Sequence, residues 1–362
     1  MNILFTESSP NIGGQELQTV AQMVAIRKKR HSVLLVCREK SKIASEAKKQ
    51  NIDVIFVPFK NSLHISSVVK LLGICQRFRP HVVICHSGHD SNIVGLTRLL
   101  CWKDRFRIIR QKTYLTKRTK IFSLNYLCDD IIVPGEATRK HLMHCGVRTN
   151  ITIVPPGFDF DKIYEESHSP VPPHIKAWLA DSGEGPVIVQ IGMLRPEKGH
   201  EFMLNLLFRL KKEGRKFRWL VVGSGSVENE RRLRAIVDDL DMHDNVLISG
   251  GIFPVSSIYK IANLIVMPSE NESFGMVAAE ASVFSIPVFA NHVGGLPDVI
   301  QHNRTGTLLP AGDMQVWRSA LNDFFERPEH FCQMAHQAKY DVANRFDINK
   351  TVSIIPGFAS CE

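Results

Sequence analysis

Four charged residues in the second half of this 362-residue chain have types and spacings that suit one ligand. Arg195 and Lys198 lie three positions apart in GMLRPEKG, and Glu272 and Glu280 enclose the segment ESFGMVAAE. Arginine binds phosphate oxygens as a planar fork and lysine binds them as a point charge, so this pair suits a diphosphate. The two carboxylates suit hydroxyl groups at the two ends of an elongated ligand. The combination indicates a nucleotide diphosphate sugar.

The elements that must position these residues follow an alternating pattern along the whole chain. Short β-branched runs, separated by stretches with helical spacing, predict strands at residues 2–6, 32–37, 53–58, 81–87, 106–111, 130–135, 187–192, 218–225, 245–250, 263–268 and 286–291. Such runs indicate parallel sheets covered by helices on both faces. We therefore expect an α/β protein with two doubly wound, Rossmann-like domains. Their binding edges, at the C-terminal ends of the strands, should face a central cleft.

The length and the prolines predict where these domains divide. A chain of 362 residues exceeds one ordinary core, and domains of about 150 to 200 residues are expected. The proline-rich segment 156–175 is typical of a linker between an N-terminal domain, 1–155, and a C-terminal domain, 176–340. We expect the last segment, 341–362, to pack back on the N-terminal domain.

The glutamate segment has its own local prediction. After the strand at 263–268, Ser273, Phe274 and Gly275 should begin a helix whose free N–H groups cradle an anion or a hydroxyl group. Glu272 then precedes the helix and Glu280 lies about two turns into it. The alternative is a dipole-stabilised acid plus a solvated glutamate. Two observations favour the ligand site: the residues around Glu280, AAEAS, are apolar, and Arg195 and Lys198 follow another predicted strand of the same sheet.

The composition excludes some classes of protein. No apolar run reaches the length of about 18 residues that spans a bilayer, and the start, MNILFTESSPN, lacks the pattern of a signal peptide. The eight cysteines form no metal-binding spacing and indicate a reducing compartment, so we expect a cytoplasmic protein.

The charge is divided unequally between the two halves. Residues 1–155 hold 25 Lys and Arg against 10 Asp and Glu, a net charge of +15, and the remainder carries −6. Nine basic residues fall between Arg98 and Lys120, interleaved with aromatic and apolar residues: Trp102, Phe106, Tyr114, Phe122 and Leu124. This pattern predicts contact with an anionic membrane surface rather than nucleic acid. The alternative is that Arg107 and Arg110 belong to a strand and make internal pairs.

The whole pattern resembles the GT-B-fold retaining glycosyltransferases, the large family that includes sucrose synthases, mannosyltransferases and lipopolysaccharide core transferases. The resemblance is carried by the Glu-seven-residues-Glu motif in ENESFGMVAAEAS, by GMLRPEKG, by the segment 292–313 and by the glycine loop GGQE at 13–16. It implies a retaining, metal-independent hexosyltransferase that moves a sugar from a nucleotide sugar to a saccharide or glycolipid. The implied pathway is lipopolysaccharide or surface-polysaccharide biosynthesis, at the inner face of the cytoplasmic membrane.

The resemblance also implies roles for single residues. Arg195 and Lys198 would hold the donor diphosphate, Glu280 the ribose, and Glu272 the transferred sugar. The other donor-binding residues implied are Gly14, Ser273, Phe274, Gly275, Met276 and Val277. Arg195, Lys198, Glu272 and His86 would be catalytic. The acceptor or the membrane would contact His86, Asp90, Lys112, Lys117, Arg118 and Lys120.

Several alternatives remain open from the sequence. His86 could instead be a hydrogen-bonded structural histidine, and Thr113 stands where many relatives carry a second histidine. No acidic pair lies at a strand end, so we expect no metal ion and no cofactor besides the nucleotide-sugar co-substrate. A nucleotide-sugar 2-epimerase and a non-catalytic nucleotide-sugar-binding protein share the fold and are the competing functions.

Overall fold

The structure, a computed structural model, describes residues 1–101, 105–114 and 119–358. It consists of two compact units. Unit 1 comprises Met1–Phe158 and Phe346–Glu362, and unit 2 comprises Asp159–Arg345. Of the residues singled out in the sequence, Trp102, Lys117 and Arg118 lie outside the described residues.

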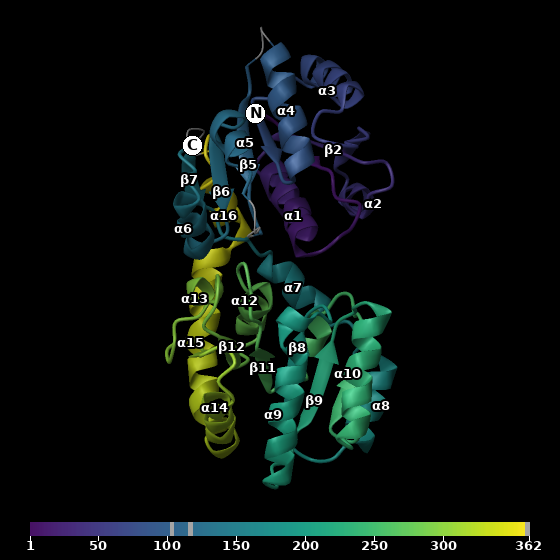
Figure 1. Ribbon diagram of the computed structural model, residues 1–362, viewed down its shortest axis with the longest axis vertical. Helices are drawn as coiled ribbons and strands as arrows, with labels where there is room; N and C mark the ends of the chain where they lie inside the picture. Colours follow the sequence, from purple (N-terminus) through teal and green to yellow (C-terminus); the bar gives the residue numbers. More distant parts are fainter. Residues whose placement is uncertain (102–104, 115–118, 359–362) are drawn as a thin grey trace. The chain divides into compact units, whose positions relative to one another are not determined.

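Unit 1 is built on a seven-stranded parallel sheet with the order β3-β2-β1-β4-β5-β6-β7 (Figure 1). Its strands are β1 (Asn2–Glu7), β2 (Ser32–Cys37), β3 (Asp53–Phe56), β4 (Val82–Cys85), β5 (Arg107–Gln111), β6 (Asp130–Val133) and β7 (Asn150–Ile153). The six strands predicted in this half are confirmed. The edge strand β7 was not predicted, because only four residues of it pair before the prolines begin.

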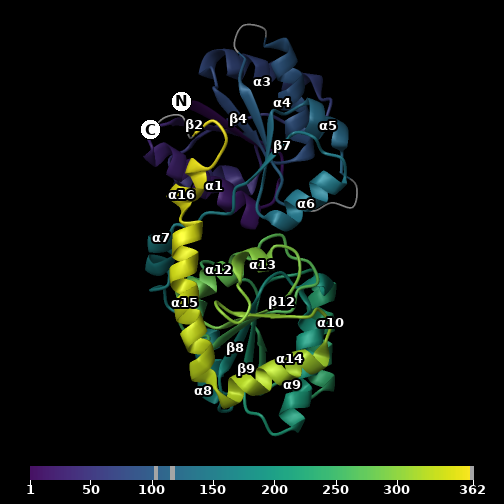
Figure 2. The ribbon, with the colours of Figure 1, turned by 90° about the vertical axis from the view of Figure 1, so that its left-hand side faces the viewer.

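Helices cover both faces of this sheet. One face packs on α1 (Gly14–Lys28), α2 (Lys42–Lys49) and the C-terminal α16 (Ile348–Ser353). The other packs on α3 (Ile65–Phe78), α4 (Gly88–Leu100), α5 (Ile121–Tyr126) and α6 (Glu136–His144). Figure 2 shows α16 beside α1, so the end of the chain completes the core of unit 1.

Unit 2 contains a six-stranded parallel sheet with the order β10-β9-β8-β11-β12-β13. Its strands are β8 (Val187–Ile191), β9 (Arg218–Val222), β10 (Val246–Ile248), β11 (Leu264–Met267), β12 (Val288–Asn291) and β13 (Thr307–Leu309). The largest core cluster lies under α9 (His200–Lys212), α10 (Val227–Asp239), α14 (Met314–Glu326) and α15 (Pro328–Phe346). The remaining helices are α7 (Phe160–Glu166), α8 (Pro173–Asp181), α11 (Ser256–Tyr259), α12 (Met276–Val283) and α13 (Leu296–Val299).

The proline-rich segment 156–175 differs from the free linker that the sequence predicts. From Asp159 onward it belongs to unit 2, where it forms α7 and the start of α8. Ile175 in α8 is fully buried, and α7 contacts α11. The prolines start α8 rather than keep the chain extended, because a proline in the first helical turn loses no hydrogen bond.

The strand orders place one switch point in each unit. The order reverses between β1 and β4 in unit 1 and between β8 and β11 in unit 2. At such a point the connections leave in opposite directions, and a crevice opens beyond the C-terminal ends of the two strands. Residues that follow β1, β4, β8 and β11 are therefore the ones positioned to meet ligands.

Candidate functional site

An ion pair spans the switch point of unit 2. Lys198, which follows β8, donates from Nζ to Oε2 of Glu272, which follows β11, at 2.6 Å. The Lys198 and Glu272 side chains are 23% and 17% exposed, so the pair is only partly hydrated. The structure therefore brings together two of the residues that the sequence assigns to one site, although 74 positions separate them.

The loop after β8 is held in place by the loop after β9. The Gly192 N–H donates to the Val222 carbonyl at 2.9 Å, and the Leu194 N–H donates to the Ser224 carbonyl at 3.0 Å. A Cβ atom at Gly223 would lie 1.8 Å from the Gly192 carbonyl oxygen, so only glycine allows this approach. The glycines of GSGS thus join the two loops, which is a structural reason for their presence.

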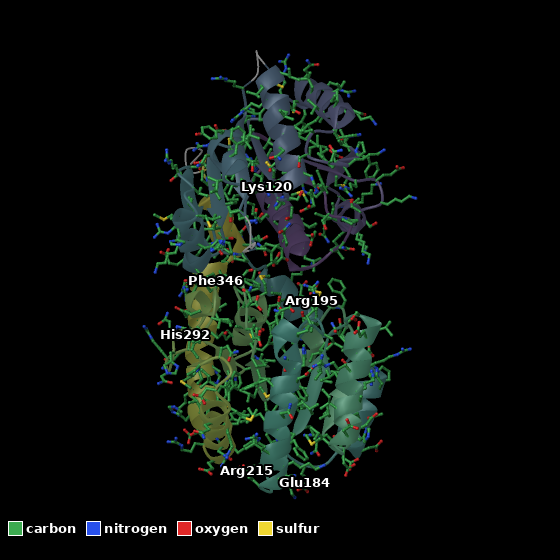
Figure 3. The ribbon with its side chains drawn as sticks, in the orientation of Figure 1. Lys120, Glu184, Arg195, Arg215, His292 and Phe346 are labelled. Carbon is green, nitrogen blue, oxygen red and sulfur yellow. The ribbon has the colours of Figure 1, made fainter. Side chains whose placement is uncertain are left out.

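Arg195 extends from this fixed loop. Its side chain is 53% exposed, and its Nη1 lies 3.7 Å from Oε1 of Glu197. Figure 3 shows Arg195 at one end of unit 2, with Glu184 and Arg215 at the opposite end. The guanidinium is therefore at the strand-end edge of the sheet and is exposed enough to meet a ligand.

The helix after β11 starts later than the sequence predicts. Helix α12 begins at Met276 rather than Ser273, because Gly275 adopts a left-handed conformation with φ of 105°. The segment before it packs on a second loop: a Cβ atom at Gly294 would lie 1.9 Å from the Glu272 carbonyl oxygen. The N–H of Gly295 donates to that same carbonyl at 2.9 Å. Ser273 and Phe274 are thus part of a braced loop, while Met276 and Val277 form the helix N-terminus.

Glu280 lies about one turn into α12 and is held by a buried tyrosine. The Tyr259 hydroxyl donates to Oε2 of Glu280 at 2.6 Å, and the Tyr259 ring stacks on Phe284. Burial, followed by the charge of Glu166, raises the pKa of Glu280 to about 7, and the Tyr259 hydrogen bond opposes this rise. Glu280 is therefore not the freely solvated glutamate of the alternative interpretation.

His200 is a residue of this site that the sequence analysis missed. It begins α9 directly after Lys198 and Gly199, and its Nε2 has no hydrogen-bond partner among the described residues. Burial and the nearby Lys198 charge lower the pKa of His200 to about 4, so the imidazole is neutral at physiological pH. Its place at the start of a helix that follows a cationic loop is the signal that could have identified it.

The switch point of unit 1 is closed by hydrogen bonds around Asp90. This carboxylate accepts from Thr6 Oγ1 at 2.7 Å, from the His86 N–H at 3.2 Å and from the Ser87 N–H at 2.9 Å. The Ser87 hydroxyl also donates to it. Asp90 has no exposed surface, so it fixes the end of β4 rather than presenting a charge to a ligand.

His86 is likewise buried and hydrogen-bonded. Its Nδ1 lies 3.1 Å from the Thr6 carbonyl, its Nε2 lies 3.0 Å from Thr19 Oγ1, and its ring stacks on Phe5. Since a carbonyl can only accept, Nδ1 carries the proton. Burial lowers the pKa of His86, which favours the neutral ring. This arrangement matches the structural histidine that the sequence left open as the alternative.

A polar chain links the end of β1 to the loop after β5. Gln15 donates from Nε2 to Oε2 of Glu7 at 3.0 Å, and the Thr113 hydroxyl donates to Oε1 of Gln15. Burial and the charge of Asp90 raise the pKa of Glu7 to about 7. Beside this chain, a Cβ atom at Gly14 would meet nothing within 4 Å, so the start of α1 is open.

Some of the described basic residues around β5 are engaged within unit 1, whereas Arg105 is exposed. Arg107 pairs with Asp130, as the alternative of internal pairing predicts, and Arg98 pairs with Asp129. Arg110 is buried as well, but the expected pair is absent: its Nε and Nη1 have no hydrogen-bond partner among the described residues. Lys112 is half-buried and Lys120 is exposed.

The described residues contain neither a candidate metal site nor a candidate membrane span. Within residues 1–101, 105–114 and 119–358, no three His, Cys, Asp or Glu side chains are grouped so that they could hold a metal ion. Over the same ranges, no helix is both long and apolar enough to cross a bilayer.

Comparison with protein families matches nearly the whole chain. Residues 12–162 match the family described as Glycosyltransferase Family 4, and residues 174–341 match the family described as Glycosyl transferases group 1. The D-inositol 3-phosphate glycosyltransferase of Gordonia bronchialis is 29% identical over 227 residues, which cover 60% of this chain and 48% of that protein. The chain thus spans about half the length of this curated relative.

Comparison with solved structures shows the same architecture. HepE of Anabaena, solved in complex with UDP and glucose, superposes with a TM-score of 0.83 at 18% identity, over 100% of both chains. The lipopolysaccharide outer core galactosyltransferase WaaB superposes with a TM-score of 0.73 at 18% identity, over 98% of this chain and 99% of that one. At these identities the likeness shows the fold, which is the expected GT-B fold.

Proposed function

Because the chain belongs to the GT-B glycosyltransferases, with a Family 4 domain followed by a group 1 domain, we propose that it transfers a sugar from a nucleotide diphosphate sugar to a hydroxyl group of a saccharide or glycolipid. The observation that carries this proposal is the ion pair of Lys198 and Glu272 across the switch point of unit 2. Arg195 and Glu280 follow the same strands. Together they supply the cations and carboxylates that such a donor needs.

The donor takes over two groups that pair with each other across the switch point of unit 2. Lys198 exchanges the carboxylate of Glu272 for a phosphate oxygen, and Glu272 turns to the hydroxyl groups of the sugar. Arg195 binds the diphosphate as a fork. The N–H groups of Met276 and Val277, at the start of α12, have no intrahelical partners and add a positive dipole end. Glu280, when ionised, accepts the two ribose hydroxyls.

The reaction then follows from where charge develops. As the sugar leaves, negative charge accumulates on the phosphate next to Lys198, Arg195 and the start of α12, which stabilise it without reorganising. We propose that the acceptor attacks from the face that the diphosphate leaves, with retention of configuration, and that the departing phosphate takes the acceptor proton. These cations replace the divalent ion that other transferases use.

The acceptor residues require a revision of the sequence-based set. His86 and Asp90 are buried and hydrogen-bonded, so we assign them to positioning the end of β4 rather than to touching the acceptor. Lys112, directly after β5, is retained as an acceptor-side residue. Gly14, at the open start of α1, keeps the donor-side role that the resemblance implies.

The acceptor class is proposed to be a glycolipid of surface-polysaccharide or lipopolysaccharide synthesis, met at the inner face of the cytoplasmic membrane. An exposed patch on α5 supports this: Phe122 and Tyr126 are 70% and 67% exposed and their rings touch, beside exposed Lys120 and Arg148. Exposed aromatic rings next to basic residues bind anionic bilayers. The double variant Phe122→Ser, Tyr126→Ser should lose pelleting with anionic vesicles at low salt. Tyr164→Ser, which removes an exposed tyrosine of unit 2, should retain it.

The test of the enzymatic proposal combines binding with product analysis. A panel of nucleotide sugars should include at least one that raises the melting temperature of the protein. That donor should release nucleotide slowly alone and rapidly with extracts containing glycolipid acceptors. Formation of an epimer from the donor alone would indicate the epimerase instead. Binding without any turnover, with or without acceptor, would indicate a binding protein.

A further inference from the structure

Arg110 is an unusual residue for the interior of unit 1. It occupies the next-to-last position of β5, its side chain is 7% exposed, and its Nε and Nη1 have no hydrogen-bond partner among the described residues. Arg107, on the same strand, is neutralised in the usual way, because it forms an ion pair with Asp130. A buried guanidinium without an anion is strongly unfavourable, because the charge loses water and gains nothing in return.

Among the described residues, no acid forms an ion pair with Arg110. Its strand neighbour is Cys85 on β4, and the charge of Arg110 also acts on Cys128. Burial raises the pKa of the Cys85 and Cys128 thiols, so both are neutral. Asp90, which acts on Cys85 too, is the carboxylate engaged by Thr6, His86 and Ser87.

A second cation lies next to Arg110. Lys112 is two residues further, and alternate residues of an extended chain point to the same face. It is half-buried, and burial and the charge of Arg110 lower the pKa of its amine. Two positive groups close enough to repel each other, at the end of a central strand, form a site for an anion.

We propose that Arg110 and Lys112 bind an anionic group of the acceptor, a phosphate or a carboxylate. The proposal rests on the function proposed above, because it assigns the acceptor to the unit that does not carry the donor residues. The Nε and Nη1 donors of Arg110 have no partner among the described residues, and Lys112 adds a point charge. The acceptor is thus recognised as a charged sugar rather than a neutral one.

The experiment measures binding of three hexoses that differ in charge. Glucose 6-phosphate, glucuronate and glucose are titrated into the whole protein at constant ionic strength, with excess UDP added to compete for the proposed donor site in unit 2. At least one anionic sugar should raise the melting temperature, whereas glucose should not. Arg110→Met should weaken that binding by about 10- to 100-fold, the value of one or two charge-assisted bonds. Arg105→Met, which removes an exposed arginine near the same strand, should not.

The unliganded variant distinguishes a binding role from a structural one. Arg110→Met removes an unpaired buried charge, so its melting temperature without ligand should be higher than that of the wild type. A lower melting temperature, or undiminished binding of the anionic sugar, would overturn the proposal. If Arg110→Met does not fold, Lys112→Gln provides the same binding comparison, and unchanged binding there overturns it as well.

The other outcomes also have a defined meaning. Equal protection by all three sugars, or by none, also overturns the anion site. If no nucleotide sugar binds to the wild type but the anionic sugar still does, the donor assignment fails while the anion site stands. Protection by the phosphate but not by glucuronate identifies a phosphorylated acceptor, and the reverse identifies a carboxylate.

Discussion

In the proposed donor site, three charged side chains have protein partners, and these contacts determine how each side chain should respond to mutation. Lys198 is paired with Glu272 at 2.6 Å, and Glu280 accepts from Tyr259 at the same distance. Each therefore has a protein partner that holds its geometry in advance. Preorganised charges of this kind contribute more to the transition state than mobile surface charges.

Replacing either Lys198 or Glu280 by alanine should nearly abolish transfer. Each change removes one charge-assisted contact from a partly dehydrated site, which should cost about 2 to 4 kcal/mol, or roughly 30- to 1000-fold in rate. Steady-state kinetics with purified variants measures this, and urea unfolding checks that the fold is retained. Near-normal turnover by either variant would contradict the assignment.

The titration of Glu280 predicts a pH dependence of donor binding. Its pKa is raised to about 7, and only the ionised carboxylate accepts two ribose hydroxyls. The affinity for the nucleotide sugar that raises the melting temperature should therefore increase as the pH rises from 6 to 8 and then become constant. Glu280→Gln should bind weakly at every pH, without this rise. A wild-type affinity that does not change over this range would show that Glu280 does not bind the donor as proposed.

At the scale of elements, the donor site depends on loops that support each other. The loop after β11 leaves room for no side chain at Gly294, whose Cβ atom would lie 1.9 Å from the Glu272 carbonyl. The same loop contacts account for the late start of α12. The segment 273–275 packs on the loop that contains Gly294 and precedes the first residue of the helix.

Gly294→Ala should therefore impair both stability and transfer. Gly312→Ala is the matched control, since both glycines have a positive φ, 54° and 75°, but a Cβ atom at Gly312 would meet nothing within 4 Å. The control should lose only the cost of a left-handed alanine, about 1 to 2 kcal/mol, and keep its activity. Gly294→Ala should be less stable than the control in urea unfolding and much less active. Equal behaviour of the two variants would refute the bracing role of this contact.

At the scale of the whole molecule, a buried acid should make stability depend on pH. Glu7 has no exposed surface, and its pKa is raised from 4.5 to about 7. Between these values the folded protein holds a proton that the unfolded chain has lost, so stability decreases as the pH rises from 4.5 to 7. The loss attributable to Glu7 is at most about 3 kcal/mol. Urea unfolding at pH 5 and pH 8 should show a smaller decrease for Glu7→Gln than for the wild type; an equal decrease would contradict this.

Metal removal tests the proposed chemistry of the complete enzyme. If Lys198, Arg195 and the start of α12 neutralise the leaving group, transfer should persist after treatment with EDTA. Activity with the identified donor is measured before and after chelation, with added Mg²⁺ and Mn²⁺ as controls. A strict requirement for either ion would mean that the leaving-group charge is stabilised in another way.

The sequence by itself determined the two sheets and the position of four charged residues after strands of the second one. Runs such as 32–37 and 187–192 are buried strands in the structure. An apolar, β-branched run between helices is typical of a strand that helices cover on both faces of the sheet. Arg195, Lys198, Glu272 and Glu280 follow predicted strands, and parallel strands end at one edge. The motif and the expected topology were therefore sufficient to group them.

Only the tertiary structure decided which of these groups are paired, buried or exposed. The pairing of Lys198 with Glu272, the tyrosine on Glu280 and the delayed start of α12 depend on contacts between loops distant in sequence, which local periodicity does not encode. The arginines of the basic segment have the same appearance in the sequence, but Arg98 and Arg107 pair with acids, whereas Arg110 pairs with no acid in the part of the chain that the structure describes. The physical reason is that the burial and the partners of a charged side chain depend on neighbouring residues. Those neighbours come together only when the strands and helices pack.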